Sequence, residues 1–435
     1  MWPLRPVLVS YKVTDYFPIS FFCWIRLYKC SKKILSSLSE NPIYLTMKKT
    51  FVLLAACLAF LAVPGCKNAP KKNTLTSEQQ NAVETQLSQM SIREKVGQLF
   101  CVRPESLDPV FQASGVGMLA YHMQAVNEET KAFCEKYPVG GVTLFSHNID
   151  NPEQLKAFTR DLHALAGAPL LSIDEEGGRV ARIGSNEHFN VPTYASMAAV
   201  GATGDPAKAL EAGTNIGTYL KEYGFDVDFA PVADVNTNPQ NIVIGDRAFS
   251  SNPKTAAPMV VNFMEGLRKE GISACIKHFP GHGDTVGDSH KEYVQTEKTW
   301  EELLNCEMIT FKAAIKAGAP MIMSAHVALP NVTGDDLPAT LSSYILKDKL
   351  RGELGFQGVI ITDAMGMKAI SDRYTSGESA IMTLKAGADI VLMPENLPEA
   401  FDAVVAAVED GTLSEARIDE SVRRVLALKL SSKEN

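Results

Sequence analysis

The stretch GISACIKHFPGHGDTVGDSH, residues 271–290, joins an apolar run to an unusually polar segment. Its first six residues, Gly271 to Ile276, predict a buried β-strand. The next fourteen, Lys277 to His290, contain three histidines, two aspartates, three glycines and a lysine. The glycines and the proline oppose a long helix and favour an ordered loop at the strand end. We expect this loop to lie outside the core, because inside the core its polar groups would lack enough hydrogen-bond partners.

Four interpretations of the segment 277–290 are open. A phosphate-binding loop is the weakest, because neither G-x-G-x-x-G nor G-x-x-x-x-G-K-[ST] is present. A metal site would use His278, His282 and His290, but their spacing matches no zinc signature and no cysteine pair assists. A solvated turn would gather three of the chain's eight histidines without a purpose. A loop that binds a hydroxylated ligand and supplies an acid–base histidine accounts for the composition best.

Apolar runs and amphipathic stretches alternate along the rest of the chain. The amphipathic stretches at 153–166, 206–223, 254–270, 300–317 and 414–430 predict helices. About eight apolar runs lie among them, at 96–102, 141–145, 169–173, 225–230, 272–276, 321–324, 358–362 and 389–393. Buried parallel strands have such continuous apolar sequences, and their alternation with helices indicates βαβ units. The pattern predicts an α/β fold, a (β/α)8 TIM-like barrel formed by one domain at 77–435.

The first 76 residues have a different character. Residues 47–65 begin with a basic pair, continue with an apolar run too short to span a membrane, and end in small residues before Cys66. They predict a lipoprotein signal peptide, with Cys66 as the lipidation site and residues 66–76 as a tether. A signal peptide that is cleaved without lipidation is the alternative. Residues 1–46 precede this better start and show no clear pattern, so we expect a misassigned start codon.

Charge and cysteine content exclude several classes of protein. Removal of residues 1–65, which hold eight basic and two acidic residues, leaves a formal charge of −14. Such a surface does not attract nucleic acid. The four cysteines beyond Cys66, at 101, 134, 275 and 306, form no C-x-x-C pair and indicate neither a metal centre nor a redox motif. Their spacing leaves disulfide formation open.

Polar residues follow several of the predicted strands directly. Asp174, Asp234, Lys277, the segment 324–326 and Asp363 each lie at or just beyond the carboxyl end of an apolar run. In a barrel these ends form one rim, where catalytic side chains converge. A doubly wound sheet would also collect them at one edge. The pattern therefore supports an α/β fold more firmly than it supports closure of the barrel.

The motif KHFPGHGDTxxDSH resembles the signature of family 3 glycoside hydrolases, specifically the bacterial β-N-acetylhexosaminidase branch. Four further segments resemble the same family in the same order: IDEEGGRV at 173–180, DFAPVADV at 228–235, IGDRAF at 244–249 and ITDAMGM at 361–367. The chain is similar to the single-domain form of the family. This resemblance implies a retaining exo-acting β-N-acetylglucosaminidase that needs no cofactor or metal. Its substrate would be terminal β-linked GlcNAc of peptidoglycan fragments or chitin-type oligosaccharides.

Asp363 is the predicted nucleophile. The resemblance puts it in the nucleophile segment of the family, and it follows the apolar run 358–362, so its carboxylate would emerge from a buried strand. A retaining glycosidase needs a carboxylate that attacks the anomeric carbon and forms a glycosyl-enzyme. The alternative role is a helix N-cap, which aspartate also favours.

The resemblance implies that His290, paired with Asp288, is the acid and base. An imidazole with an ordinary pKa of about 6.5 can protonate the leaving oxygen and later activate water. Asp288 would fix the tautomer of the imidazole, and an acid/base that is neutral when deprotonated avoids the like-charge repulsion that a second carboxylate would have with Asp363. A surface histidine without a role is the alternative. Transfer to an acceptor other than water also stays open, because a neutral imidazole does not repel an anionic acceptor.

The same resemblance implies that the substrate is bound by Asp174, Arg247, Lys277 and His278. Arg182 lies close after the E-E-G-G turn and is a further candidate, although a structural salt bridge would explain it equally well. A carboxylate accepts hydrogen bonds from sugar hydroxyls, and cationic side chains donate to hydroxyl or carbonyl oxygens.

Two other functions remain open at the level of sequence. One is a β-glucosidase or xylosidase of the same family, although the glucosidase branch lacks the Asp-Ser-His triplet of residues 288–290. The other is a catalytically inactive sugar-binding lipoprotein, although Asp363 and His290 are both present. The expected partners are a GlcNAc-containing oligosaccharide or muropeptide and, through Cys66, a membrane. We expect a lipid-anchored protein of the bacterial cell envelope, in the periplasm or on the outer membrane.

Overall fold

The structure is a computed structural model, and it describes residues 75–114, 122–287 and 292–433. All of these belong to one compact unit of the chain, Pro70–Asn435. The predicted signal peptide and Cys66 lie outside the described residues, as do Asp288 and His290. Within the described part, no helix is both long enough and apolar enough to cross a membrane.

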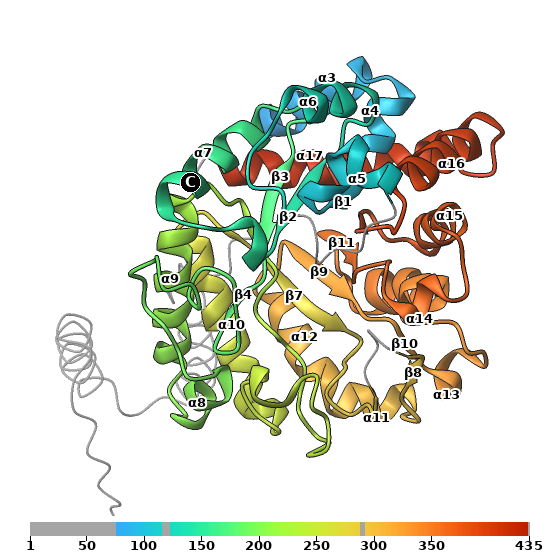
Figure 1. The fold of residues 1–435 in the computed structure, drawn as a ribbon. Coiled ribbons are helices and arrows are strands. Elements are labelled where there is room, and N and C mark those ends of the chain that lie inside the picture. The colour runs from blue at the N-terminus through green and yellow to red at the C-terminus, as the bar shows by residue number, and fades with distance from the viewer. Residues whose placement is uncertain (1–74, 115–121, 288–291, 434–435) are drawn as a thin grey trace, which may run out of the picture. The chain divides into compact units, whose positions relative to one another are not determined.

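Eight parallel strands form the centre of this unit (Figure 1). Their spatial order is β11 (Val359–Thr362), β9 (Met321–Ser324), β7 (Ser273–Phe279), β6 (Val227–Asp228), β3 (Leu170–Ile173), β2 (Gly141–Leu144), β1 (Phe100–Val102) and β12 (Val391–Leu392). A parallel bridge between Ile361 and Ile390 joins the two edges, so the sheet closes on itself. The predicted (β/α)8 TIM-like barrel is confirmed.

Helices surround the strands and connect one to the next (Figure 1). They are α3 (Ser77–Gln89), α4 (Ile92–Gly97), α5 (Pro109–Ser114), α6 (Glu128–Lys136), α7 (Pro152–His163), α8 (Met197–Ala202), α9 (Pro206–Glu222), α10 (Pro253–Lys269), α11 (Trp300–Asn305), α12 (Glu307–Lys316), α13 (Pro330–Thr333), α14 (Lys368–Ser371), α15 (Ser376–Ala386), α16 (Leu397–Glu409) and α17 (Glu415–Lys433). Short helical turns include η1 (Pro104–Leu107) and η3 (Gly245–Arg247), and η5 (Tyr344–Glu353) is a π-helix.

Residues that cap helices set the start of several of these elements. Asn151, Asp205 and Asn252 each accept a hydrogen bond from a backbone N–H in the first turn, and each is followed by a proline at the first helical position. The helix predicted at 300–317 is wrong in one respect. Cys306 leaves the helical angles, with φ −134° and ψ −88°, and divides the stretch into α11 and α12.

The inside of the barrel is apolar below its carboxyl-terminal rim. Side chains of the strands pack there with Val425 and Leu428 of α17, which closes the amino-terminal end of the barrel. Each buried aliphatic side chain of this kind contributes about 1.5–3 kcal/mol. Polar groups are thus left to gather at the opposite, carboxyl-terminal end.

The segment 277–290 departs from the sequence-based expectation in its first residues. Strand β7 continues through Phe279, and the side chains of Lys277, His278 and His282 are buried. The expectation that the whole segment lies outside the core is therefore wrong for these three. Their burial is tolerated because each has polar partners, which the next subsection describes.

Candidate active site

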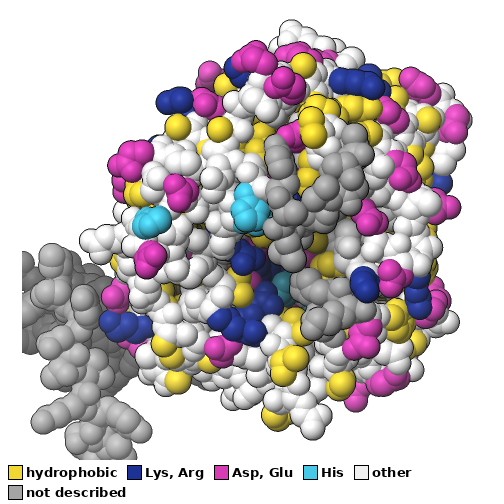
Figure 2. Space-filling view, viewed as in Figure 1, with side chains coloured by type: hydrophobic (Ala, Val, Ile, Leu, Met, Phe, Trp, Pro, Cys, Tyr) yellow, Lys and Arg dark blue, Asp and Glu magenta, His cyan; other side chains and the backbone are white. Residues whose placement is uncertain are grey.

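A cavity of about 1170 Å³ opens at the carboxyl ends of the barrel strands. Six of the sequence-predicted site residues contribute to its wall, namely Asp174, Arg182, Arg247, Lys277, His278 and Asp363. Figure 2 shows Lys and Arg side chains gathered at a hollow on this face. The fold thus brings together side chains from strands that are far apart in the sequence.

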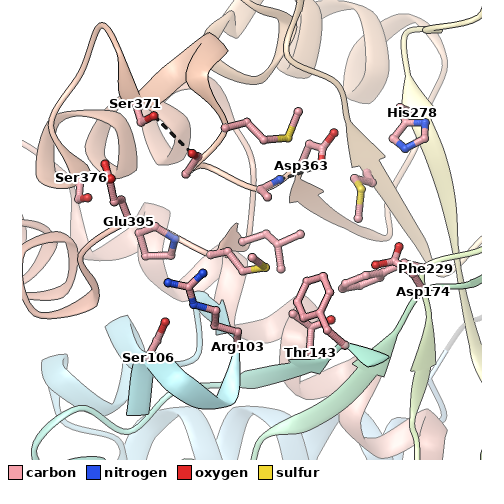
Figure 3. A pocket seen from close by; sticks show the side chains of 18 of the residues that line it. Arg103, Ser106, Thr143, Asp174, Phe229, His278, Asp363, Ser371, Ser376 and Glu395 are labelled. Atoms are coloured by element: carbon pink, nitrogen blue, oxygen red, sulfur yellow. Dashed lines mark hydrogen bonds between the residues drawn. The ribbon is translucent and has the colours of Figure 1, made fainter. Parts of the chain in front are cut away.

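Asp363 directly follows β11 and faces the cavity. Figure 3 shows it between Asp174 and His278 on one side and Ser371 on the other. Its N–H donates to the Ser324 carbonyl over 2.9 Å, and its Oδ1 accepts from the N–H of Ala364 over 2.8 Å. The N-cap of the next helix, α14, is Met367. The alternative interpretation of Asp363 as an N-cap is therefore wrong.

Lys277 lies in a buried ionic cluster at the wall of the cavity. Its Nζ is 2.6 Å from Asp174 Oδ1 and 2.6 Å from Glu176 Oε1. Burial opposes the charge on the ammonium, but the attraction of Asp174 and Glu176 outweighs it and raises the pKa of Lys277. The side chain is therefore an ammonium at neutral pH, with N–H groups that can donate to a ligand oxygen.

Arg247, in η3, belongs to the same cluster. Its Nε and Nη2 donate to the two carboxylate oxygens of Glu176, each over 2.7 Å. Burial alone would raise the pKa of Glu176, yet the charges of Arg247 and Lys277 hold it well below its ordinary value. This fork-to-fork geometry fixes the plane of the guanidinium.

Arg182 meets the cluster from its other side. Its Nη2 is 3.5 Å from Asp174 Oδ2, and its guanidinium lies over the ring of Phe145 at 5.4 Å. Burial opposes the charge of Asp174, but Lys277 and Arg182 together keep its pKa below the ordinary value. Arg182 thus lines the cavity and also takes part in a salt bridge, so the two roles considered for it are compatible.

His278 is oriented by Asp234, which is completely buried. Asp234 Oδ2 lies 2.7 Å from Nδ1 of His278 and also accepts its backbone N–H, while Oδ1 accepts the N–H of His282 over 2.6 Å. The carboxylate assigns the proton of the imidazole to Nδ1, so that Nε2 can accept a hydrogen bond from a ligand. Burial lowers the pKa of His282, which is therefore neutral at pH 7.

The loop that follows β7 is anchored as far as the structure describes it. Asn241 Nδ2 donates to the carbonyls of His282 and Thr285 over 2.7 and 3.1 Å. Asp284 accepts from Thr237 Oγ1 over 3.0 Å and lies 3.3 Å from Lys298 Nζ. The predicted acid–base pair, Asp288 and His290, begins beyond Gly287 and lies outside the described residues.

Sequence reasoning assigned no role to Glu176, and it placed Asp234 at the rim without naming a partner. A signal for Glu176 was present in the sequence. Side chains two residues apart in an extended segment point to the same side, and Asp174 and Glu176 both reach Lys277. Glu175, between them, turns to the opposite side and accepts the backbone N–H groups of residues 182–184.

The cavity continues past Asp363 into a second lobe. Its wall there is formed by residues of η1, α14, α15 and the segment after β12, including Arg103, Ser371, Arg373, Ser376 and Glu395. In Figure 3 Arg103 and Glu395 lie on the far side of Asp363 from His278. The wall of the cavity also includes the rings of Phe111 and Tyr374 and the apolar side chains of Leu392 and Met393.

Metal and disulfide chemistry are not indicated by the described residues. No group of three or more His, Cys, Asp and Glu side chains in ranges 75–114, 122–287 and 292–433 is arranged to hold a metal ion. The four cysteines in these ranges, at 101, 134, 275 and 306, form no disulfide with one another.

Comparison with known proteins gives a consistent result. The family model described as "Glycosyl hydrolase family 3 N terminal domain" matches residues 91–428. Beta-hexosaminidase A of Pseudoalteromonas piscicida is 34% identical over 333 residues, which cover 71% of this chain and 56% of the relative. The Beta-hexosaminidase of Alkalilimnicola ehrlichii is 38% identical over 290 residues, covering 65% of this chain and 81% of the relative.

Comparison with solved structures gives a match in the same family. A glycoside hydrolase family 3 β-N-acetylglucosaminidase from Paenibacillus sp. superposes with a TM-score of 0.71 at 37% identity. The match covers 79% of this chain and 63% of that one. The present chain thus spans only part of that structure and 56% of the P. piscicida enzyme.

Proposed function

Because this chain belongs to glycosyl hydrolase family 3, we propose that it is a retaining exo-acting β-N-acetylglucosaminidase. The observation that carries the proposal is a single cavity whose wall contains the carboxylate of Asp363 together with Asp174, Lys277 and His278. The names of the β-hexosaminidase and β-N-acetylglucosaminidase relatives support the choice of sugar. The reaction would release terminal β-linked GlcNAc.

In the proposed mechanism Asp363 attacks the anomeric carbon and forms a covalent glycosyl-enzyme, which water then hydrolyses. Asp174 would accept hydrogen bonds from hydroxyls of the terminal sugar. Lys277 and Arg247 would donate to its oxygens, and His278 would accept through Nε2. All four line the cavity, and the pKa shifts of Asp174, Lys277 and Arg247 keep these three side chains ionised for such bonds.

The acid–base step rests on the sequence alone. His290 would protonate the departing oxygen and afterwards take a proton from water, while Asp288 holds the imidazole in the required tautomer. A His290→Ala variant should therefore lose least activity on aryl substrates whose leaving group needs no protonation. A loss that does not depend on the leaving-group pKa would contradict this role.

The second lobe of the cavity supports a leaving group larger than a small alcohol. The volume of about 1170 Å³ exceeds the roughly 300–1,000 Å³ of sites that hold drug-sized ligands. Arg103, Arg373 and Glu395 in its wall favour peptidoglycan fragments, which carry ionised groups, over neutral chitin-type oligosaccharides. Measuring kcat/KM for peptidoglycan fragments and for chitin-type oligosaccharides with the same preparation would show which substrate is preferred.

The decisive assay compares aryl β-GlcNAc with aryl β-glucose as substrates of the protein lacking its signal peptide, residues 67–435. The proposal expects turnover of the GlcNAc compound by a large margin. Preference for glucose would favour a β-glucosidase instead. Mass spectrometry of a 2-fluoro-sugar adduct on Asp363 distinguishes a catalyst from a sugar-binding protein that has lost activity.

We also propose that the mature protein is held at the cell envelope by a lipid on Cys66, in the periplasm or on the outer membrane. The support is the signal-peptide pattern of residues 47–65. Cys66→Ala should move the protein from the membrane fraction to the soluble fraction. Mass spectrometry that finds an unmodified Cys66, or peptides from residues 1–46, would contradict the proposed processing.

A further inference from the structure

We infer that Glu176 is a positioning residue, which holds the Lys277 ammonium and the Arg247 guanidinium where they meet the terminal sugar. The inference rests on the proposed function, because it concerns the sugar-binding part of the same cavity. It adds a residue to which neither the sequence pattern nor the resemblance assigned a role.

The geometry of Glu176 differs from that of a surface ion pair. Its side chain is 1% exposed, against 2% for Lys277 and 11% for Arg247. One carboxylate oxygen is shared between Lys277 Nζ at 2.6 Å and Arg247 Nη2 at 2.7 Å, and the other accepts Arg247 Nε at 2.7 Å. Short charge-assisted bonds in a buried site are strong and directional.

These bonds tie together three separate segments of the chain. Glu176 lies in β4 (Glu175–Gly177), Lys277 in β7 and Arg247 in η3. Neither cation is placed rigidly by its own element. Lys277 has a flexible four-carbon stem, and Arg247 lies in a three-residue turn within a long connection. Glu176 supplies the common point that defines both orientations.

The donors of the two cations can be counted. The Lys277 ammonium has three N–H groups, and Asp174 and Glu176 account for two of them. The third can point to a sugar oxygen. Arg247 uses Nε and Nη2 toward Glu176 and Nη1 toward the carbonyl of Val243 over 2.9 Å. With five N–H groups in its fork, it keeps further donors for a ligand.

Removal of the carboxylate charge should therefore disturb binding through these two cations. In Glu176→Gln one oxygen becomes an NH2 group, which faces a donor of Lys277 or Arg247 in either amide orientation. The cluster also loses a negative charge that balances two neighbouring cations. Glu176→Asp keeps the charge, but its stem is one methylene shorter and cannot reach both cations from the same backbone.

Glu175 provides a matched control. It is adjacent in sequence and equally buried, but it faces away from the cavity. Its carboxylate accepts the N–H groups of residues 182–184 and the Tyr219 hydroxyl, the last over 2.8 Å. Glu175→Gln should therefore reduce stability without removing a partner of either cation.

The experiment measures kcat, KM and Tm of wild type, Glu176→Gln, Glu176→Asp and Glu175→Gln with aryl β-GlcNAc, well below each Tm. We expect kcat/KM to fall at least thirtyfold in Glu176→Gln, with KM raised at least tenfold. Glu176→Asp should lie between it and wild type. Glu175→Gln should lower Tm but raise KM by clearly less than Glu176→Gln does, because it leaves the Glu176 contacts of both cations in place. If Glu176→Gln does not fold, Glu176→Asp takes its place in the comparison.

A double-mutant cycle with Lys277→Met separates positioning from a general structural effect. If Glu176 acts through Lys277, the effects of the two substitutions overlap. The fold-reduction in kcat/KM of the double variant should then be at least three times smaller than the product of the fold-reductions of the two single variants. Two results would overturn the inference while leaving the proposed function intact. One is that the effects of the two substitutions on kcat/KM simply multiply, and the other is that Glu176→Gln has the same KM as an active wild type. A wild type inactive on aryl β-GlcNAc would overturn the proposed function and the inference together.

Discussion

Asp234→Asn tests how far the orientation of His278 depends on one buried carboxylate. Asp234 is fully buried, and its two oxygens accept from His278 Nδ1 at 2.7 Å, from the His278 N–H at 3.2 Å and from the His282 N–H at 2.6 Å. All three partners are donors. Asparagine presents one oxygen and one NH2 group, so in either orientation a donor faces a donor.

The cost can be worked out from these contacts. At least one hydrogen bond to a charged acceptor is lost, worth about 1.5–3 kcal/mol, and the buried donor left without an acceptor costs about 1–3 kcal/mol more. We therefore expect a loss of about 2.5–6 kcal/mol. With an unfolding entropy of about 2.1 cal/mol/K per residue over roughly 360 residues, this corresponds to a fall in Tm of about 3–8 °C. Loss of the His278 orientation should lower kcat/KM about tenfold.

The Tm difference between Asp234→Asn and wild type should also depend on pH, which a purely steric effect would not. Burial opposes the charge of Asp234, but the hydrogen bonds from His278 and His282 hold its pKa below the ordinary value. A lowered carboxyl pKa gives stability that is fully present above the unfolded-state pKa, about 3.9, and is lost as the pH falls through the folded-state pKa. The Tm difference should be complete at pH 7 and shrink below about pH 4.

The assay is differential scanning calorimetry from pH 3 to 8, together with kcat/KM on aryl β-GlcNAc. Asp205→Asn is the control, because Asp205 is an exposed N-cap of α9 and asparagine caps equally well. The reasoning is refuted if Asp234→Asn stays within 1 °C of wild type at pH 7 and keeps its kcat/KM within twofold.

Three further changes test other parts of the structure. Asp363→Ala should lower kcat by a factor on the order of 10⁴ or more at unchanged Tm, and activity near that of wild type would disprove its role as nucleophile. Asp389→Ala removes a buried carboxylate that is paired with three arginines at the amino-terminal end of the barrel, so it should cost about 3–5 kcal/mol without changing kcat. Glu84→Gln removes the α3 partner of an exposed ion pair with Arg423 of α17, so it is the calorimetric control and should leave Tm within 1 °C. A chelator should leave kcat unchanged, because the proposed reaction uses carboxylate and imidazole groups; activity that is lost and then restored by Zn²⁺ would contradict this.

Much of the fold was accessible from local sequence patterns. The apolar runs at 141–145, 169–173 and 358–362 became β2, β3 and β11, because a strand buried on both faces must be apolar along its length. Boundaries were less accurate. The stretch 300–317 showed helical periodicity throughout, yet it is broken at Cys306. Periodicity reports the buried face of a helix, and it does not report a change of direction between two helices.

The candidate site was predictable to the extent that it depends on position along a strand. Asp174, Lys277 and Asp363 were expected at one rim, and they line one cavity. The burial of Lys277 and His278 was not foreseen. Their partners, Glu176 and Asp234, come from distant segments, and a sequence contains no distances between such segments.

Local sequence patterns are sufficient to predict where strands form and which polar groups stand at the strand ends, because both depend on neighbours along the chain. Closure of the sheet, and the sharing of one carboxylate between Lys277 and Arg247, follow only from the three-dimensional packing. The reason is physical. Closure and ion pairing depend on how far apart residues lie in space, and that distance is set when the strands pack around a common core.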